Sequence, residues 1–515
     1  MSVKRIIGTE SEFGVLSTEE KNPIALSVWL VDSYAQTQPS GPITWDYRGE
    51  DPLNDARGFR LDRADAHPTQ LTDNPEEMAP AMESVARPSQ ALLDLPGPSN
   101  TVLPNGARFY VDHAHPEYSG PEAAGPLEAV AYDLAGDEIA RRAMAAAAAE
   151  HGPITLYKNN TDGKGASYGS HENYLVERSV VFDDLASVLI PFLVTRQILC
   201  GAGRVGLGQR SQAPGFQVSQ RADFIENDIG LETTFNRPIL NTRDEPHALT
   251  RWRRLHVIVG DANLFEVSNF LKMGTTSAML WLLENVGPTL ELDALQLEAP
   301  VFDVAAVSHD PLGHRLKLRD GRALTAIELQ SIYAGVCRSA MEQAGSVDDE
   351  TELLLSTWES VLTDMSADLA LVADRVEWVA KYQVLSGIRQ RDQLEWDAPK
   401  LRTIDLQWHD LRPDKSVAGK LVRAGRVARL LTDSDIERCT AAPPKDTRAY
   451  LRGELIRRYP EAVSAASWDS ITVDTGEEAL LRIPLPSPDR ARHQEVGALL
   501  DENDLPGFVS ALKGQ

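Results

Sequence analysis

Four segments of the chain alternate between polar and apolar residues with period two, the spacing of a half-buried β-strand. The clearest begins at Arg108 and places Arg108, Tyr110 and Asp112 on one face. We expect Pro116 to end this strand, with Glu117 just beyond it. A cation, a phenol and two carboxylates are costly to bury without partners. We therefore interpret this face as the lining of a site.

The other three segments each place polar residues two positions apart in apolar surroundings. These polar pairs are Glu10/Glu12, His171/Asn173 and Arg254/His256. Taken singly, each pair also fits a solvated edge strand or a buried histidine with satisfied hydrogen bonds. Neighbouring antiparallel strands would bring the pairs within a few ångströms of one another. Together they predict one site that pools carboxylates, imidazoles and arginines.

This set of side chains indicates a metal and a phosphate ligand. Oxygen ligands with some imidazole suit Mg²⁺ or Mn²⁺, and Mg²⁺ is commonly shared with nucleotide phosphates. Arginines bind phosphates. Residues 201–206 match G-x-G-x-x-G, but a helical pattern precedes them and a Gln/Ser/Pro-rich stretch follows, so we reject a dinucleotide-binding turn. The residues alone predict a metal–nucleotide site on a sheet.

Helical periodicity covers residues 24–36, 127–150, 264–295 and 324–390, which with the strands predicts an α+β fold. Residues 40–98 are rich in Pro, Asp, Asn and Gly and predict a long loop, in which aromatic islands at 45–47 and 55–59 dock on the protein. Residues 466–485 predict a terminal pair of strands. We divide the chain into a domain of residues 1–425 and a small domain of residues 426–515.

Composition limits the partners and the location. A net charge of −25 disfavours nucleic-acid binding, because a phosphate backbone attracts a basic surface. No apolar run reaches the ~18–20 residues of a membrane span, and the N-terminus lacks a signal-peptide pattern. The cysteines are odd in number and far apart, which argues against a disulfide framework. We expect a cytoplasmic monomer that meets any acidic partner through a local basic patch.

Six stretches resemble one known family, the Pup ligase/deamidase family, whose fold is related to glutamine synthetases and γ-glutamyl-cysteine ligases. They are residues 8–14, 105–119, 157–162, 165–174, 241–247 and 446–450. The resemblance covers nearly the whole chain. It implies a glutamine synthetase-like domain with a curved antiparallel sheet cradle over residues 1–425. The small domain of residues 426–515 then contributes to the nucleotide site.

The family has a ligase branch and a deamidase/depupylase branch. Ninety residues separate Gly14 from Asn105, which resembles the loop insertion of the second branch, although residues 60–98 match it poorly. This implies hydrolysis of the C-terminal Gln amide of Pup to Glu, and of the Pup–lysine bond in pupylated proteins. The alternatives are an ATP-consuming Pup–protein ligase, a ligase of small carboxylates and amines, and a Pup-binding scaffold without activity.

The resemblance also assigns roles to residues. It makes Asp112 the catalytic carboxylate, as nucleophile or as general base, and implies ATP, or ADP plus phosphate, with Mg²⁺ as cofactors. The implied metal-binding residues are Glu10, Tyr110 and Glu117, followed by Glu12, His171, Asn173 and His256. The implied nucleotide-binding residues are Arg108, Arg254, Arg448 and Trp468. Two arginines of the middle section, which otherwise serve only to balance local acids, are expected to receive acidic Pup: Arg204 and Arg221.

Overall fold

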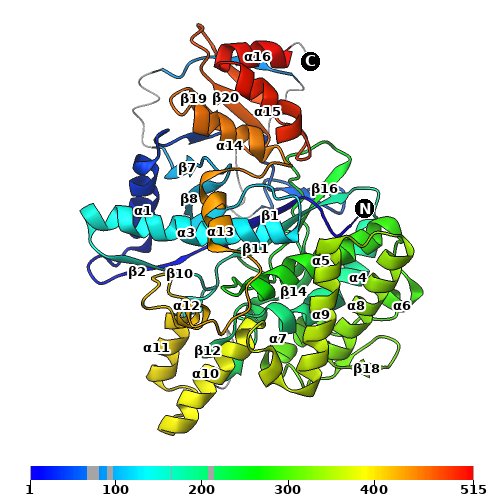
Figure 1. The fold of residues 1–515 in the computed structure, drawn as a ribbon. Helices are drawn as coiled ribbons and strands as arrows, with labels where there is room; N and C mark the ends of the chain where they lie inside the picture. Colours follow the sequence, from blue (N-terminus) through cyan, green and yellow to red (C-terminus); the bar gives the residue numbers. More distant parts are fainter. Residues whose placement is uncertain (1, 67–80, 90–96, 164, 207–213, 514–515) are drawn as a thin grey trace.

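The computed structural model describes residues 2–66, 81–89, 97–163, 165–206 and 214–513, and its centre is an eight-stranded sheet (Figure 1). The strand order is β14-β15-β16-β11-β1-β9-β8-β7, and every neighbouring pair is antiparallel except β14 with β15. The strands are β1 (Ile7–Glu12), β7 (Asn100–Val102), β8 (Arg108–Asp112), β9 (His115–Ser119), β11 (Ser170–Glu177), β14 (Asn227–Gly230), β15 (Pro238–Asn241) and β16 (Trp252–Val257). The four alternating segments therefore all lie in one sheet.

The chain reverses sooner than Pro116, so the prediction that this proline ends the strand is wrong. The strand β8 ends at Asp112, and the turn places His113 at φ 50°. Pro116 then lies within β9, opposite Val111. A proline cannot donate to a ladder but can accept, and its carbonyl accepts the backbone N–H of Phe13 at 2.9 Å. Glu117 therefore reaches the site from a neighbouring strand.

Helices cover the face of the sheet opposite the one that carries the polar residues of the four alternating strands. Helix α3 (Pro126–His151) begins with a proline, contains a run of alanines and ends before Gly152 at φ 71°. It lies across the strands in Figure 1. The apolar helices α4 (Phe182–Cys200) and α5 (Glu266–Asn285) pack on each other within the main core. With this face occupied by helices, the polar residues of the strands face away from the core.

Further helices outside the C-terminal region extend this layer, where α1 and α13 pack on α3, or form the lower part of the molecule in Figure 1. They are α1 (Pro23–Thr37), α6 (Leu290–Asp293), α7 (Pro300–His309), α8 (Ala326–Gln343), α9 (Asp349–Ala367), α10 (Glu377–Asp392), α11 (Pro399–Trp408), α12 (Val417–Arg423) and α13 (Asp433–Ala441). Short strand pairs join β2 (Gly14–Ser17) to β10 (Ile154–Tyr157), and β12 (Arg204–Gly206) to β13 (Gly215–Gln217). Helix α4 directly precedes the G-x-G-x-x-G stretch, as expected. None of the helices in the described ranges is long and apolar enough to cross a bilayer.

The C-terminal region has a core of its own, built on a five-stranded sheet of order β3-β19-β20-β21-β6. Its strands are β3 (Thr44–Trp45), β6 (Glu83–Val85), β19 (Val463–Ala466), β20 (Ser470–Val473) and β21 (Leu480–Pro484). Helices α14 (Ala449–Arg458), α15 (His493–Glu502) and α16 (Leu505–Lys513) complete it. Where the sequence predicted two strands, the structure has three, β19, β20 and β21. The two outer strands of the sheet, β3 and β6, come from the predicted loop of residues 40–98.

The island at 45–47 docks through Trp45, as expected, whereas the island at 55–59 docks through Asp55 and Ala56 and leaves Phe59 48% exposed; residues 67–80 and 90–96 lie outside the described ranges. Trp45 is buried in the C-terminal core. Asp55 lies in the hairpin of β4 (Asn54–Asp55) and β5 (Phe59–Arg60), where it accepts the Thr242 hydroxyl at 2.7 Å. The predicted boundary at residue 426 precedes α13, which packs on α3, and Tyr132 donates to the Ala442 carbonyl at 3.0 Å. The packing of the large domain therefore continues past that boundary.

Candidate active site

Strand register brings the predicted polar pairs onto one face of the sheet. Strand β1 lies between β11 and β9, so its residues have a partner on each side. The cross-strand pairs that result are Glu10 with His171, Asn173 with His256, Glu12 with Glu117, Tyr110 with Glu117, and Asp112 with His115. The prediction that four separate segments form one face is confirmed by this pairing.

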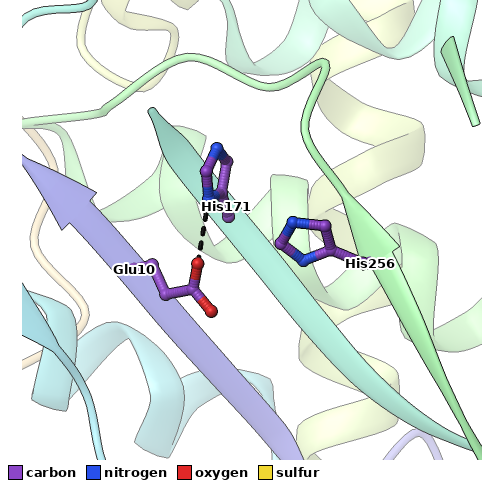
Figure 2. Close-up of side chains that lie close together, drawn as sticks. All are labelled: Glu10, His171 and His256. Carbon is purple, nitrogen blue, oxygen red and sulfur yellow. Dashed lines mark hydrogen bonds and ion pairs between the residues drawn. The ribbon is translucent and has the colours of Figure 1, made fainter. Parts of the chain in front are cut away.

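Glu10, His171 and His256 (Figure 2), together with Asn173, which hydrogen-bonds to Glu10 and His256, form what we name the imidazole cluster. His171 Nδ1 lies 2.9 Å from Glu10 Oε2, and the Asn173 amide donates to Glu10 Oε1 at 2.8 Å. His256 Nδ1 lies 2.8 Å from the Asn173 Oδ1 atom. Burial disfavours a charged Glu10, but the hydrogen bond from His171 and the nearby His256 and Arg254 hold its pKa far below the usual range. Burial, with Arg254, lowers the pKa of His256 well below its usual range.

Glu12, Asp112 and Glu117 form what we name the carboxylate cluster, in which one oxygen of each lies within 4.8 Å of the others. Glu117 is 3% exposed, and among the described residues it has no ion pair. Burial and the repulsion of Asp112, Glu12 and Glu10 raise the pKa of Glu117 well above its usual range. The side chain of Asp112 is 41% exposed, so this carboxylate is open to a reactant.

A divalent cation fits these two clusters. Three clustered carboxylates, one of them buried without a counter-charge, form a set of hard oxygen donors, which Mg²⁺ prefers. The phenol of Tyr110 belongs to the same face, and its oxygen lies 3.4 Å from Ser119 Oγ, which in turn donates to Glu117 at 3.5 Å. The imidazole cluster adds nitrogen donors next to these oxygens. The residues predicted to bind metal thus lie close together. That they bind a metal stays a prediction.

A pocket with about 580 Å³ of empty space lies between this sheet and the C-terminal region. Five of the predicted site residues line it: Glu10, Asn173, Arg254, Arg448 and Trp468. The strands β1, β9, β11 and β16 supply its floor, while Arg448 directly precedes α14 and Trp468 lies in the turn between β19 and β20. Two arginines and an aromatic ring beside the metal-binding face suit a nucleotide, with the phosphates near the arginines.

Several residues of this pocket had no role in the sequence analysis, including Glu122, Glu245 and His247. Glu122 accepts from Arg448 at 2.7 Å and pairs with Arg452. Although burial raises it, these two guanidinium groups lower the pKa of Glu122 to about 2. Glu245 and His247 belong to the 241–247 stretch, which resembles the family but to which the sequence analysis assigned no role. No local pattern marks Glu122, because its partners lie more than 300 residues away.

Arg108 does not line the pocket, although the resemblance implies that it binds nucleotide. Its Nε donates to Asn100 Oδ1 at 2.6 Å, and one of its amino groups donates to the Tyr47 hydroxyl at 2.9 Å. Its guanidinium carbon lies 3.8 Å from the centre of the Tyr110 ring. The nucleotide role of Arg108 stays a prediction, and its observed partners are side chains of the protein.

Arg204 and Arg221 do not form the exposed basic surface that we expected. They are 4% and 1% exposed. Arg221 donates to the Tyr168 carbonyl at 2.9 Å, and burial together with Arg237 lowers its pKa to about 9. Arg204 donates to the Gln220 carbonyl at 3.3 Å. Buried guanidinium groups with backbone partners are typical of a structural role, so direct contact of both with Pup stays a prediction without support from their placement.

Two histidines of the 105–119 stretch also reach the site, and the sequence analysis gave neither a role. His113 Nδ1 lies 2.8 Å from Asp112 Oδ2, and this hydrogen bond raises the pKa of His113 although burial opposes it. His115 Nδ1 lies 3.3 Å from Glu12, and its ring stacks on Tyr168 at 4.3 Å. In the sequence, their position close to Asp112, the candidate catalytic carboxylate, was the signal that could have identified them.

The fold and the site define a class of protein. It is an α+β protein with a mainly antiparallel sheet whose face away from the helices carries clustered carboxylates and imidazoles, beside a pocket lined by arginines. Such a face is suited to metal-assisted chemistry on a carbonyl or a phosphoryl group.

The chain belongs to the Pup-ligase protein family, whose profile matches residues 5–472. The chain is 45% identical to a depupylase of Acidothermus cellulolyticus, over 99% of each chain. It is also 45% identical to a Pup deamidase/depupylase of Mycobacterium tuberculosis, over 98% of this chain and 97% of that one. A Pup–protein ligase of Paenarthrobacter aurescens is 38% identical over 78% of this chain and 90% of the relative.

Solved structures of ligases share the fold. The ligase PafA in its complex with Pup gives a TM-score of 0.76 at 29% identity, over 99% of this chain and 95% of that one. PafA in complex with ADP gives a TM-score of 0.72 at 35% identity, over 80% of this chain and 91% of that one. The expected α+β fold, with its antiparallel sheet and helical layer, is confirmed.

Proposed function

We propose that this protein is a Pup deamidase and depupylase. It hydrolyses the side-chain amide of the C-terminal Gln of Pup, and the isopeptide bond between Pup and a lysine. Relatives that carry these names match the chain from end to end, whereas the ligase relative covers 78% of it. The observation that carries the proposal is Asp112, an accessible carboxylate at the rim of a buried carboxylate cluster.

Asp112 has two chemically complete routes to the same product. It attacks the amide carbonyl as a nucleophile, and a water then hydrolyses the resulting anhydride and regenerates Asp112, or it takes a proton from a water that attacks the carbonyl directly. In both routes the C–N bond breaks, and the departing nitrogen leaves as ammonia or as the amine of lysine after it gains a proton. His113 Nδ1 lies 2.8 Å from this carboxylate, which raises the pKa of His113 and favours its protonated form.

The cofactors we propose are Mg²⁺ and ATP, or ADP with phosphate. Glu12 and Glu117, with Tyr110 and the imidazole cluster, would hold the metal, which when bound polarises the carbonyl and offsets negative charge. Arg254 would bind phosphates, and Trp468 would contact the base; Arg448, which is 2% exposed, would bind phosphate by leaving its ion pair with Glu122. The ADP complex of the ligase PafA supports a nucleotide in this fold.

Pup is the partner that we propose, supported by the complex of Pup with PafA and by the names of the relatives. Pup is acidic, and so is this chain, with a net charge of −25. The contact therefore needs local cations. Charge-reversal variants Arg204→Glu and Arg221→Glu would test the two buried arginines; unchanged Pup affinity in both would exclude direct contact.

The decisive experiment incubates the protein with Pup ending in Gln, Mg²⁺ and ATP, and follows ammonia release and the mass of Pup. A mass gain of one unit with ammonia release supports deamidation. The same assay with a pupylated protein tests depupylation. Stoichiometric ADP release with Pup ending in Glu and a protein acceptor would instead establish the ligase, the second candidate that the PafA structures favour.

A further inference from the structure

The turn that joins β8 to β9 contains a residue in an unusual backbone conformation. His113 directly follows Asp112, the last residue of β8, and its φ is 50°. This value lies in the left-handed region, which is unfavourable for a residue other than glycine. Such strain persists only where the surrounding structure holds it, and it is frequent at functional sites. His113 is therefore a candidate for a functional role.

The surrounding structure holds this turn from two sides. Asp112 pairs with His115 at the end of the β8–β9 ladder. On the other side, the hydroxyl of Ser27, a fully buried residue of helix α1, lies 2.8 Å from the carbonyl oxygen of Ala114, the second residue of the turn. Helix α1 also packs on both strands. The backbone of His113 is thus fixed by its neighbours.

The imidazole of His113 lies against the carboxylate of the preceding residue. Its Nδ1 atom is 2.8 Å from Asp112 Oδ2, and in the part of the chain that the structure describes no other group donates to this carboxylate. The Asp112 Oδ1 atom therefore has no donor. Nδ1 donates both in the imidazolium ion and in the neutral Nδ1–H tautomer, so the contact does not require a charged ring.

We propose that His113 is a positioning residue that orients the carboxylate of Asp112. The imidazole holds Oδ2, which fixes the rotation of the carboxylate and leaves Oδ1 for the amide carbonyl or for the attacking water. Without this contact, a side chain that is 41% exposed would sample several orientations, and those that miss the carbonyl are unproductive. The inference rests on the proposed function for the chemistry of Asp112.

The first test measures the steady-state deamidation of Pup ending in Gln by His113→Gly, with saturating Mg²⁺ and ATP. Glycine adopts the left-handed conformation without strain, so the turn is kept while the imidazole is lost. We expect kcat to fall about tenfold with an unchanged KM for Pup, because the variant loses the orientation of Asp112 and keeps the binding of Pup. A kcat within about twofold of wild type would overturn the proposal.

Two further variants separate the hydrogen bond from the backbone. His113→Asn keeps both, because asparagine tolerates the left-handed region and its amide donates, and it should recover kcat to within about threefold of wild type. His113→Ala loses the donor and keeps the strain, so its kcat should match that of His113→Gly while it unfolds at a lower temperature. Equal kcat values for the Asn and Gly variants would overturn the role as a donor.

The matched control is Gln393→Gly. Gln393 is exposed and also has a left-handed backbone, with φ 53°, but it lies at the C-terminal end of α10 and outside the sheet. Glycine at this position should leave kcat and KM unchanged. A loss of kcat equal to that of His113→Gly would show a general effect of the substitution on the protein and would overturn the proposal.

A second measurement needs no turnover. In protein labelled with ¹⁵N-histidine, at a pH above the pKa of the ring, nitrogen chemical shifts identify which imidazole nitrogen carries the proton. The contact with Asp112 predicts the Nδ1–H tautomer for His113, and Asp112→Ala should shift it toward the Nε2–H tautomer that free histidine prefers. The His113→Asn spectrum assigns the signal. An Nε2–H tautomer in the wild-type protein would overturn the proposal.

The two proposals can fail separately. If the spectra show the Nδ1–H tautomer while wild-type protein neither deamidates Pup nor cleaves pupylated protein, the proposed function fails and the contact between His113 and Asp112 stands. If wild-type protein hydrolyses Pup amides while His113→Gly keeps full kcat, the positioning role fails alone.

Discussion

The imidazole cluster and the carboxylate cluster lie side by side on one sheet face, and they balance charge in opposite ways. In the first, Glu10 accepts from His171 and Asn173, and Arg254 is nearby, so its pKa is lowered. In the second, Glu117 faces other carboxylates without a cation, and its pKa is raised. The pKa values of two glutamates thus shift in opposite directions within a few neighbouring strands.

The difference shows where a cation is needed. The imidazole cluster is satisfied by its own hydrogen bonds, so it can exist without a ligand. The carboxylate cluster would gain stability from a divalent ion, which would remove the repulsion between its members. We therefore expect the carboxylate cluster to govern the response of the protein to metal and to pH, while the neighbouring pocket governs nucleotide affinity.

The largest effect should come from Asp112→Asn. The amide neither attacks a carbonyl well nor accepts a proton, so we expect deamidation to fall by about 10³-fold or more. Mass spectrometry of Pup ending in Gln measures it. Asp228→Asn, at an exposed position away from the site, is the control and should keep full activity. Activity within tenfold of wild type in the Asp112 variant would remove Asp112 from the chemistry.

Next in size is the stabilisation by Mg²⁺. At a concentration 100-fold above its dissociation constant, a bound ion adds about 2.7 kcal/mol to the free energy of unfolding. Glu117→Gln should lose most of this gain in urea unfolding, because it removes a donor and a negative charge. The control Glu128→Gln replaces another glutamate whose pKa is raised by burial, outside the site, and should keep the gain. Equal Mg²⁺ responses in the two variants would contradict the assignment.

The metal-free protein should also lose stability as pH rises above about 4.5, the usual pKa of glutamate. Folded Glu117 keeps a proton that the unfolded chain releases, so the slope is negative, up to about 1.4 kcal/mol per pH unit. Urea unfolding in chelator between pH 5 and 7 measures this slope, and Glu117→Gln should flatten it. Glu10 acts in the opposite sense: its stabilisation is present above pH 4.5 and is lost as pH falls below that value.

The smallest effect concerns the pocket. Trp468→Leu removes an aromatic face beside the proposed base position, and we expect about fivefold weaker ATP binding, with unchanged turnover at saturating ATP. Titration calorimetry checks the affinity. Trp29→Leu is the control, since that ring stacks on His151 away from the pocket. A loss of turnover that ATP cannot restore would show that Trp468 acts on the chemistry.

The sequence by itself determined which residues share the functional face. Alternation is a local property, because a strand turns successive side chains to opposite sides, so Tyr110 and Asp112, or Glu10 and Glu12, needed no tertiary information. The same holds for the helical segments and for the docking of Trp45, whose size and apolar character disfavour exposure in a polar loop.

Only the tertiary structure decided which residues meet. Glu117 comes opposite Tyr110 through a hairpin, and Glu122 finds Arg448 and Arg452 across more than 300 residues. Cross-strand register and domain packing depend on contacts between distant segments, and no periodicity along the chain encodes them. The placement of Arg221 has the same explanation. Its charge predicted a position on a basic surface, but its burial beside the Tyr168 carbonyl is a property of the assembled fold.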